Sequence, residues 1–317
     1  MTQAPAKSPL LYFVVLLLVN TMWAFQFSGA KIATAHLGPI TVTFLPMALS
    51  TLFFAPFVVF RRRSPAPDAT PASRREIVLG FLAAGTLGIV ASQLGLTWGV
   101  LHSLASNASV ITLTIPVLTA ALAAALLGEK MTGLRWVAFL LAIAGVLLVS
   151  DTNWNQVEVF RGRYLFGNLL ILVSCFGSAF YNTYSKKLLQ TFNPIEVMVY
   201  SYLVTDTVLL ALMVLFEPTQ WRLLLSLDAG VWLSLATIAV FSLSTSTILF
   251  FWVIERIDVT QASLSIYLLP VLGVAISAVT LHERVTSRLL AGGGLVLLGT
   301  FLVTTYEERR KAAAARS

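Results

Sequence analysis

The chain contains the stretch Ile115-Pro116-Val117-Leu118 and, nine residues later, Leu127-Gly128-Glu129-Lys130-Met131-Thr132. It repeats this pattern, 154 positions on, as Leu269-Pro270-Val271-Leu272 and Leu281-His282-Glu283-Arg284-Val285-Thr286. The same shift places Gln93 on Thr247 and Gly145 on Gly299. Self-similarity at a fixed interval is the signature of a duplicated unit. We therefore expect two copies of one unit, residues 1–150 and 151–317.

The composition places both units in a membrane. Hydrophobic residues make up 57% of the chain, charged residues 11%, and the mean hydropathy is +0.85. A soluble domain carries roughly a quarter charged residues. The net charge of +7 does not indicate nucleic-acid binding, because the basic residues fall between apolar runs rather than along one exposed face. We therefore expect the lipid bilayer, and no nucleic acid, as the surroundings of the chain.

Apolar runs predict an all-α membrane protein with ten transmembrane helices. The expected spans are residues 10–30, 39–60, 76–98, 102–127, 133–150, 164–186, 194–216, 229–253, 257–281 and 287–305. Five spans per unit is an odd number, so the second unit crosses the membrane in the opposite sense to the first. The prediction is two inverted five-helix repeats, an architecture that recurs among transporters.

The basic residues predict the orientation. With the N-terminus in the cytoplasm, fifteen Lys and Arg residues fall on the inner side and six on the outer side. Positively charged loops resist translocation, so this asymmetry favours the cytoplasm for both termini. We expect a multi-pass protein of the inner (plasma) membrane.

These motifs together resemble the drug/metabolite transporter superfamily, in its ten-helix branch with two EamA-type repeats. The first copy reads Ser106-Asn107-Ala108-Ser109 through Pro116 to Gly128-Glu129 and Gly145, and the second reads Gln261-Ala262-Ser263 through Pro270 to Glu283 and Gly299. The second copy departs from the first at His282, which replaces Gly128. The resemblance implies a secondary transporter, often an exporter of amino acids, related metabolites or drugs. It also implies a central cavity lined by the first, third and fourth helices of each half.

Polar and aromatic side chains inside the spans are the candidates for substrate binding, because polar groups in a membrane need partners or water. They are Asn20, Trp23, Gln26, Gln93, Asn107, Tyr181, Asn182, Gln261, Ser265 and Tyr267. Asn107 and Gln261 are equated by the repeat, which favours them as a pair of gate residues. The alternative for each amide is a hydrogen bond between helices, and for each aromatic ring it is core packing.

Three further residues have two readings each. Pro116 and Pro270 lie inside spans, where proline removes a backbone donor, so each is a hinge or a static kink. Asp206 is the acidic residue nearest the middle of a span, and its repeat counterpart is Thr51. An isolated carboxylate there is costly, so Asp206 is either a group that shuttles protons during coupling or a structural residue on a peripheral helix.

Other functional classes lack their motifs in this sequence. There is no HExxH sequence, no phosphate-binding GxxxxGK[ST] loop and no repeated ion filter, so we expect no enzyme and no cofactor. A sugar-phosphate or nucleotide-sugar exchanger is the alternative transporter, and Lys31 and Lys186 are the basic residues that approach its needs. A receptor or scaffold that transports nothing is the alternative of another class. The expected partners are a small-molecule substrate and protons or another coupling ion, with a monomer as the working unit and a dimer as the alternative.

Overall fold

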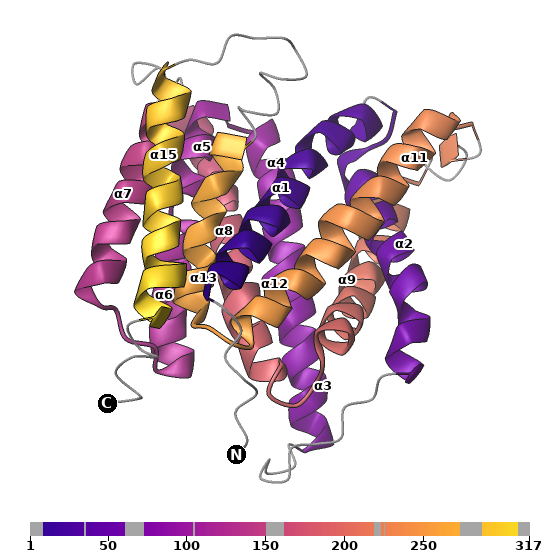
Figure 1. Ribbon diagram of the computed structural model, residues 1–317. Coiled ribbons are helices and arrows are strands. Elements are labelled where there is room, and N and C mark those ends of the chain that lie inside the picture. The colour runs from indigo at the N-terminus through magenta and orange to yellow at the C-terminus, as the bar shows by residue number, and fades with distance from the viewer. Residues whose placement is uncertain are drawn as a thin grey trace.

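The computed structural model describes residues 9–34, 36–60, 73–103, 105–149, 162–218, 223–224, 226–272 and 287–309. Within these ranges the regular secondary structure is entirely helical (Figure 1). The second copy of the Gly-Glu turn, residues 281–286, lies outside them.

Helices follow the predicted spans in order. The first half forms α1 (Pro9–Thr34), α2 (Pro39–Phe60), α3 (Arg74–Ala83), η1 (Ala84–Val90), α4 (Ala91–Leu101), α5 (Ala105–Thr112), α6 (Ile115–Leu127) and α7 (Gly133–Val149). The second half forms α8 (Gly162–Leu188), α9 (Pro194–Phe216), α11 (Ala229–Thr237), η3 (Ile238–Thr245), α12 (Ser246–Ile254), α13 (Val259–Ser263), η4 (Leu264–Tyr267), α15 (Ser287–Phe301) and η5 (Leu302–Tyr306).

The described residues contain seven helices long and apolar enough to cross a membrane. Three shorter apolar helices cover Ile115–Leu127, Gly133–Leu148 and Val259–Leu272. They fall within the residues expected for the fourth, fifth and ninth spans. Large apolar side chains such as Leu52 and Leu215 face outward, as lipid requires.

The third helix of each half contains a π-helical segment. η1 joins α3 to α4, and η3 joins α11 to α12. Ala84 and Ile238, where the two segments begin, are separated by the repeat interval of 154. π-helical turns are rare and are often found at functional sites. Their occurrence at matching positions makes the third helix of each half a candidate for the functional site.

The kink predicted at Pro116 takes the form of a break. α5 ends at Thr112, two residues form a turn, and α6 begins at Ile115 with Pro116 in its first turn. Proline suits this position because the first turn of a helix has no intrahelical partner for its N–H groups. In the second half the 3₁₀ turn η4 precedes Pro270 at the corresponding place. Each proline thus follows an interruption, and its role as a hinge stays a prediction.

Glycines let α4 and α8 approach closely. A Cβ atom on Gly95 would lie 2.8 Å from the carbonyl oxygen of Leu170, and one on Gly99 would lie 3.0 Å from that of Gly167. Small residues allow this contact of backbones, which is a common way for helices to associate in membranes. The close packing fixes the α8 face that borders the site described below.

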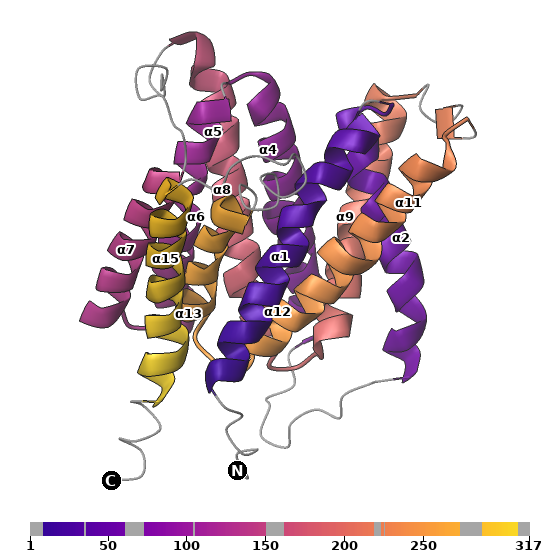
Figure 2. The same cartoon turned by 45° about the horizontal axis from the view of Figure 1, so that its top comes forward.

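Figures 1 and 2 show that α1 begins and the last helix finishes at the same end of the bundle. The turn between α12 and α13 lies at this end too. We call it the terminal end.

Candidate functional site

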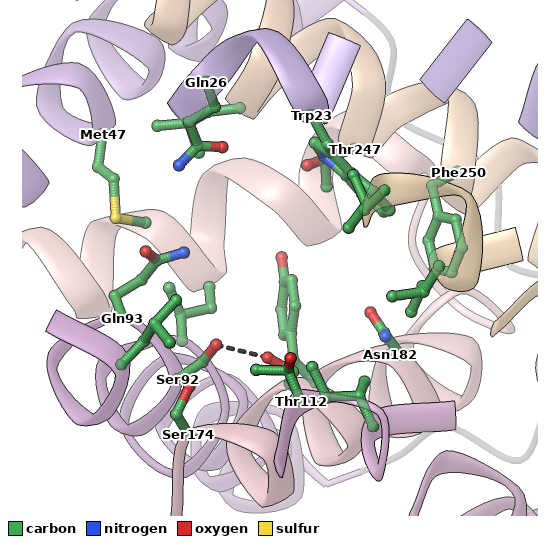
Figure 3. A pocket seen from close by; sticks show the side chains of 18 of the residues that line it. Trp23, Gln26, Met47, Ser92, Gln93, Thr112, Ser174, Asn182, Thr247 and Phe250 are labelled. Carbon is green, nitrogen blue, oxygen red and sulfur yellow. Dashed lines mark hydrogen bonds between the residues drawn. The ribbon is translucent and has the colours of Figure 1, made fainter. Parts of the chain in front are cut away.

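A cavity of about 230 Å³ lies between helices from both halves of the chain (Figure 3). Its lining residues are Trp23, Gln26, Met47, Ile89, Ser92, Gln93, Leu96, Thr112, Ile115, Ser174, Ser178, Tyr181, Asn182, Tyr202, Leu243, Thr247, Phe250, Phe251, Ile266 and Leu269. They come from α1, α2, the third helix of each half, the interrupted fourth helix of each half, α8 and α9. The size suits a small metabolite.

The polar part of the lining is neutral. Gln26 on α1 and Gln93 on α4 approach from different helices, and Asn182 contributes a third amide from α8 (Figure 3). Ser174 and Ser178 precede Asn182 at intervals of four, which places all three on one face of α8. Among the described residues that line the cavity, no side chain is charged. The site therefore offers hydrogen bonds and no fixed ionic partner.

Aromatic rings lie among these polar groups in the lining (Figure 3). Trp23 packs on Phe250 with ring centroids 5.4 Å apart, and Tyr181 packs on Phe251 at 5.6 Å. Such rings provide a large apolar surface with few rotatable bonds. Tyr202 is held in place because its hydroxyl donates to the Leu243 carbonyl at 2.9 Å. The cavity therefore suits a ligand with both a polar and an apolar part.

Two hydrogen bonds near the cavity join counterpart positions of the repeat, which aligns at 154 positions in the fourth helices and at 155 in the second, where Pro39-Ile40 matches Pro194-Ile195. The Tyr267 hydroxyl donates to the Leu113 carbonyl at 2.8 Å, across a separation of 154 positions. The Thr51 hydroxyl donates to Asp206 Oδ2 at 2.6 Å, across 155 positions. When corresponding positions of two similar units touch, they lie next to the axis that relates the units.

The last helices of the two halves show the reciprocal arrangement. A Cβ on Gly145 of α7 would lie 2.5 Å from the Gly292 carbonyl oxygen, and one on Gly299 of α15 would lie 2.8 Å from the Ala138 carbonyl oxygen. Ala138 corresponds to Gly292, and Gly145 corresponds to Gly299. The same contact is thus made twice with the partners exchanged, as expected of a two-fold relationship.

The EamA-like transporter family model matches this chain twice, over residues 10–151 and 165–305. The chain belongs to the EamA-like transporter family. The resemblance noted in the sequence is thereby confirmed, and membership identifies the chain as a membrane transporter rather than an enzyme.

Three relatives of this EamA-like transporter match along nearly their whole length. An "uncharacterized transporter" of Archaeoglobus fulgidus is 26% identical over 293 residues, covering 92% of this chain and 98% of that protein. A "probable terminal-alkyne amino-acid exporter" of Streptantibioticus cattleyicolor is 24% identical, covering 94% and 95%. A "probable amino-acid metabolite efflux pump" of Salmonella typhimurium is 25% identical, covering 93% and 96%. A crystal structure with a TM-score of 0.75 and 18% identity covers 94% of this chain and 98% of its own, which shows the fold alone.

Five of the ten predicted binding residues line the cavity of this EamA-like transporter: Trp23, Gln26, Gln93, Tyr181 and Asn182. The sequence prediction did not include the cavity serines Ser92, Ser174 and Ser178. The spacing of four between Ser174, Ser178 and Asn182 is a signal that would have found two of them.

Three predicted residues instead join helices beside the cavity. Asn20 donates to the Leu16 carbonyl at 2.7 Å and to Ser265 Oγ at 2.9 Å, which connects α1 to η4. Tyr267 makes the bond to Leu113 described above and is 1% exposed. These contacts match the alternative of a bond between helices. Asn20, Ser265 and Tyr267 do not line the cavity, so direct substrate binding by these three residues stays a prediction.

The repeat-related pair Asn107 and Gln261 lies near opposite ends of the bundle. Asn107 on α5 is buried and donates to Ser103 Oγ and to Asn168 Oδ1, both at 3.3 Å. Gln261 on α13 accepts a bond from the backbone N–H of Asp258, and its amide donates to the Val303 carbonyl at 3.1 Å. Neither side chain lines the cavity. Their predicted role as gate residues is compatible with these places.

Asp206 is half-buried in α9 and does not line the cavity. Its Oδ2 accepts the bond from Thr51, and its Oδ1 has no hydrogen-bond partner within the described residues. Tyr202, one turn earlier on α9, does line the cavity. The carboxyl group thus lies one helical turn from the site and on the contact between the repeat counterparts.

Proposed function

We propose that this chain is a secondary transporter that exports small amphipathic metabolites without net charge, such as amino acids or related compounds and drugs, by alternating access. The observation that carries the proposal is the cavity lining, in which amides and hydroxyls lie among aromatic rings and no described side chain is charged. Amides both donate and accept hydrogen bonds, so they can bind the carboxylate and the ammonium group of a zwitterion.

The proposed architecture is ten transmembrane helices in two inverted five-helix repeats, residues 1–150 and 151–317. The contacts of Tyr267 with Leu113 and of Thr51 with Asp206 support it, because they join counterpart positions. The two matches of the family model divide the chain at the same place. An inverted repeat can form two similar conformations around one site, each open to one side of the membrane.

The same architecture supports an inner-membrane location with both termini in the cytoplasm. An even number of crossings returns the chain to the side where it began. The shared position of the first and last helix ends at the terminal end agrees with this (Figure 2). The excess of Lys and Arg assigned to that side agrees with the positive-inside rule. We propose a monomer as the transporting unit.

Export of amino-acid-like compounds is favoured by two relatives, whose names describe an amino-acid exporter and an amino-acid metabolite efflux pump. A sugar-phosphate exchanger would need basic side chains in the cavity to neutralise phosphate. Lys186 does not supply one, since its Nζ donates to the Ile257 carbonyl and lies 3.5 Å from Glu129. The side chain of Lys31 lies outside the described part of the structure.

Asp206 is our candidate for proton coupling. Proton coupling needs a group that changes protonation within the membrane, and isolated intramembrane carboxylates have this role in many pumps and transporters. The position of Asp206, one turn from the lining residue Tyr202, supports a link between its protonation and the shape of the cavity.

The test is flux of labelled amino acids and neutral aromatic compounds in proteoliposomes. We expect saturable flux that falls at least about tenfold in Gln93→Ala and Asn182→Ala, because each loses a hydrogen bond in a water-poor site. Gln190→Ala is the matched control, since Gln190 is exposed outside the cavity. The proposal is supported if Gln190→Ala keeps the parent's flux while Gln93→Ala and Asn182→Ala both lose it. No flux of any compound favours a receptor or scaffold, and flux of sugar phosphates alone favours the exchanger.

A further inference from the structure

Arg135 is a buried cation at the terminal end of the bundle. It lies in the first turn of α7 and is 1% exposed. Its Nε donates to Glu307 at 3.1 Å, Nη1 donates to the Lys130 carbonyl at 2.9 Å, and Nη2 forms an ion pair with Asp258. These partners belong to the turn before α7, the turn before α13 and the last turn of the final helix. One guanidinium therefore ties together segments from both halves of the chain.

Glu129 makes a second connection between the halves. Its carboxylate accepts bonds from the backbone N–H groups of Val259 at 2.8 Å and Thr260 at 3.0 Å, the first residues of α13. A carboxylate is favourable there because the N-terminus of a helix presents unpaired N–H groups and the positive end of its dipole. Lys186, at the end of α8, pairs with Glu129 and donates to the Ile257 carbonyl at 2.7 Å. The turn after α6 is thus joined to both α8 and α13.

Two of the helices that line the cavity, α8 and the one that begins with α13, carry these connections on their terminal side. Asn182 lines the cavity, and Lys186 follows it on α8 by four residues, a rise of about 6 Å. Ile266 also lines the cavity and follows Val259 by seven residues, about 10 Å along the helix. Lys186 and the contact of Glu129 with α13 therefore lie one or two helical turns from the cavity lining, on its terminal side. We call Glu129, Arg135, Lys186, Asp258 and Glu307 the ionic floor.

Stability alone is a weak reason for such a cluster. Removing charges from water is costly, and a buried ion pair often adds little net stability compared with well-packed apolar residues. Buried ionic groups are better suited to fixing one arrangement of segments among several. Here the fixed arrangement holds the first half against the second half below a cavity that, on the proposed function, opens to each side in turn.

We propose that the ionic floor is the gate on the terminal side of the cavity. Opening to that side requires Arg135 to leave Asp258 and Glu307, and Lys186 and the start of α13 to leave Glu129. The ionic floor acts as a gate because it joins segments that belong to different halves and move relative to one another during transport. A purely structural cluster would join segments that keep the same relative position. Weakening the floor shifts the population toward the state open at the terminal end. This inference rests on the proposed alternating access.

The experiment measures access to the cavity from each face. Cys175 is replaced by Ala, and Ser178→Cys places one thiol in the cavity at almost the original size. A membrane-impermeant maleimide is applied to one face at a time, in right-side-out and inside-out vesicles. In Arg135→Gln we expect labelling from the terminal face to rise about tenfold or more, and labelling from the opposite face to stay equal or fall.

Arg256→Gln is the matched control. Arg256 lies at the same end, in the turn that follows α12, and its contacts with Glu255 and Trp252 are with neighbours in the chain. Its replacement removes the same charge without separating the two halves, so its labelling should equal that of the parent. If Arg135→Gln does not fold, Glu307→Gln removes one partner of the floor and should raise terminal-face labelling to a smaller extent.

Two results would overturn the gate. One is unchanged labelling from the terminal face in Arg135→Gln or, where that variant does not fold, in Glu307→Gln. The other is an equal rise from both faces, which indicates general loosening of the bundle. Flux is measured on the same protein to separate this inference from the proposed function. Transport by the parent without side-specific labelling contradicts the gate alone, whereas side-specific labelling without flux of any compound contradicts the proposed transport and leaves the gate supported.

Discussion

The hydroxyl of Tyr267 donates to the carbonyl of Leu113, and each residue occupies the position in its half that the other occupies in its own. Leu113 is in the turn that interrupts the fourth helix of the first half, and Tyr267 ends the 3₁₀ turn of its counterpart. The two fourth helices are therefore in contact where their α-helical hydrogen bonding is interrupted.

Tyr267→Phe should reduce stability and flux modestly. The change removes one hydrogen bond from a buried carbonyl, a loss of about 0.5–1.5 kcal/mol. Thermal unfolding in detergent and flux in proteoliposomes measure the two effects. Tyr306→Phe is the control because Tyr306 is 52% exposed. Equal behaviour of the two variants would show that the Tyr267 bond has no special role.

Gly299→Ala should destabilise the protein, and Gly294→Ala should not, although both lie on α15. A Cβ at Gly299 would lie 2.8 Å from a backbone oxygen of α7, whereas one at Gly294 would meet nothing within 4 Å. In open space the alanine favours the helix by about 1 kcal/mol. Unfolding temperatures of both variants check this. A stable Gly299→Ala would contradict the close contact of α7 and α15.

Trp23→Ala should weaken transport of aromatic substrates more than that of aliphatic ones. Loss of the ring removes stacking of about 0.5–1.5 kcal/mol, so the ratio of kcat/KM values should change several-fold. Trp136→Ala is the control, since Trp136 is 55% exposed on the outer surface. An unchanged ratio in Trp23→Ala would place the aromatic part of the substrate elsewhere.

Asp206→Asn should make flux insensitive to the proton gradient. An amide does not bind and release protons near neutral pH as a carboxyl group can. A transport cycle that depends on protonation of Asp206 therefore loses its coupling to the proton gradient. Flux is measured with the gradient intact and after a protonophore. Asp228→Asn makes the same change at an exposed helix cap and should keep the parent's response. Parent flux that is unaffected by the protonophore would rule out proton coupling.

The sequence predicted the order of the helices because apolar runs of membrane length are long and clearly bounded. It predicted the amides at Gln26, Gln93 and Asn182 because polar groups are rare in such runs. It did not predict which amides face the cavity, because the repeat equates Asn107 with Gln261 without saying toward which neighbours their side chains point. That direction depends on helix rotation and on the interruptions before Pro116 and Pro270.

The ionic floor and the π-helical segments could not be predicted from the sequence either. Arg135 is one of the fifteen basic residues that the sequence assigns to loops and tails on the inner side. Its burial depends on Asp258 and Glu307, which are more than a hundred positions away. The π-helical segments have the same hydrophobic composition as an α-helix, so no pattern of residues marked them.

The most direct test of the central claim is labelling of the single cavity thiol in the Cys175→Ala, Ser178→Cys protein with its ionic floor intact, from each face in turn, with and without a transported compound. Alternating access predicts labelling from both faces and slower labelling from both when the compound is bound. Labelling that is confined to one face under all conditions, or that no transported compound slows, would contradict a substrate cavity that opens alternately to the two sides of the membrane.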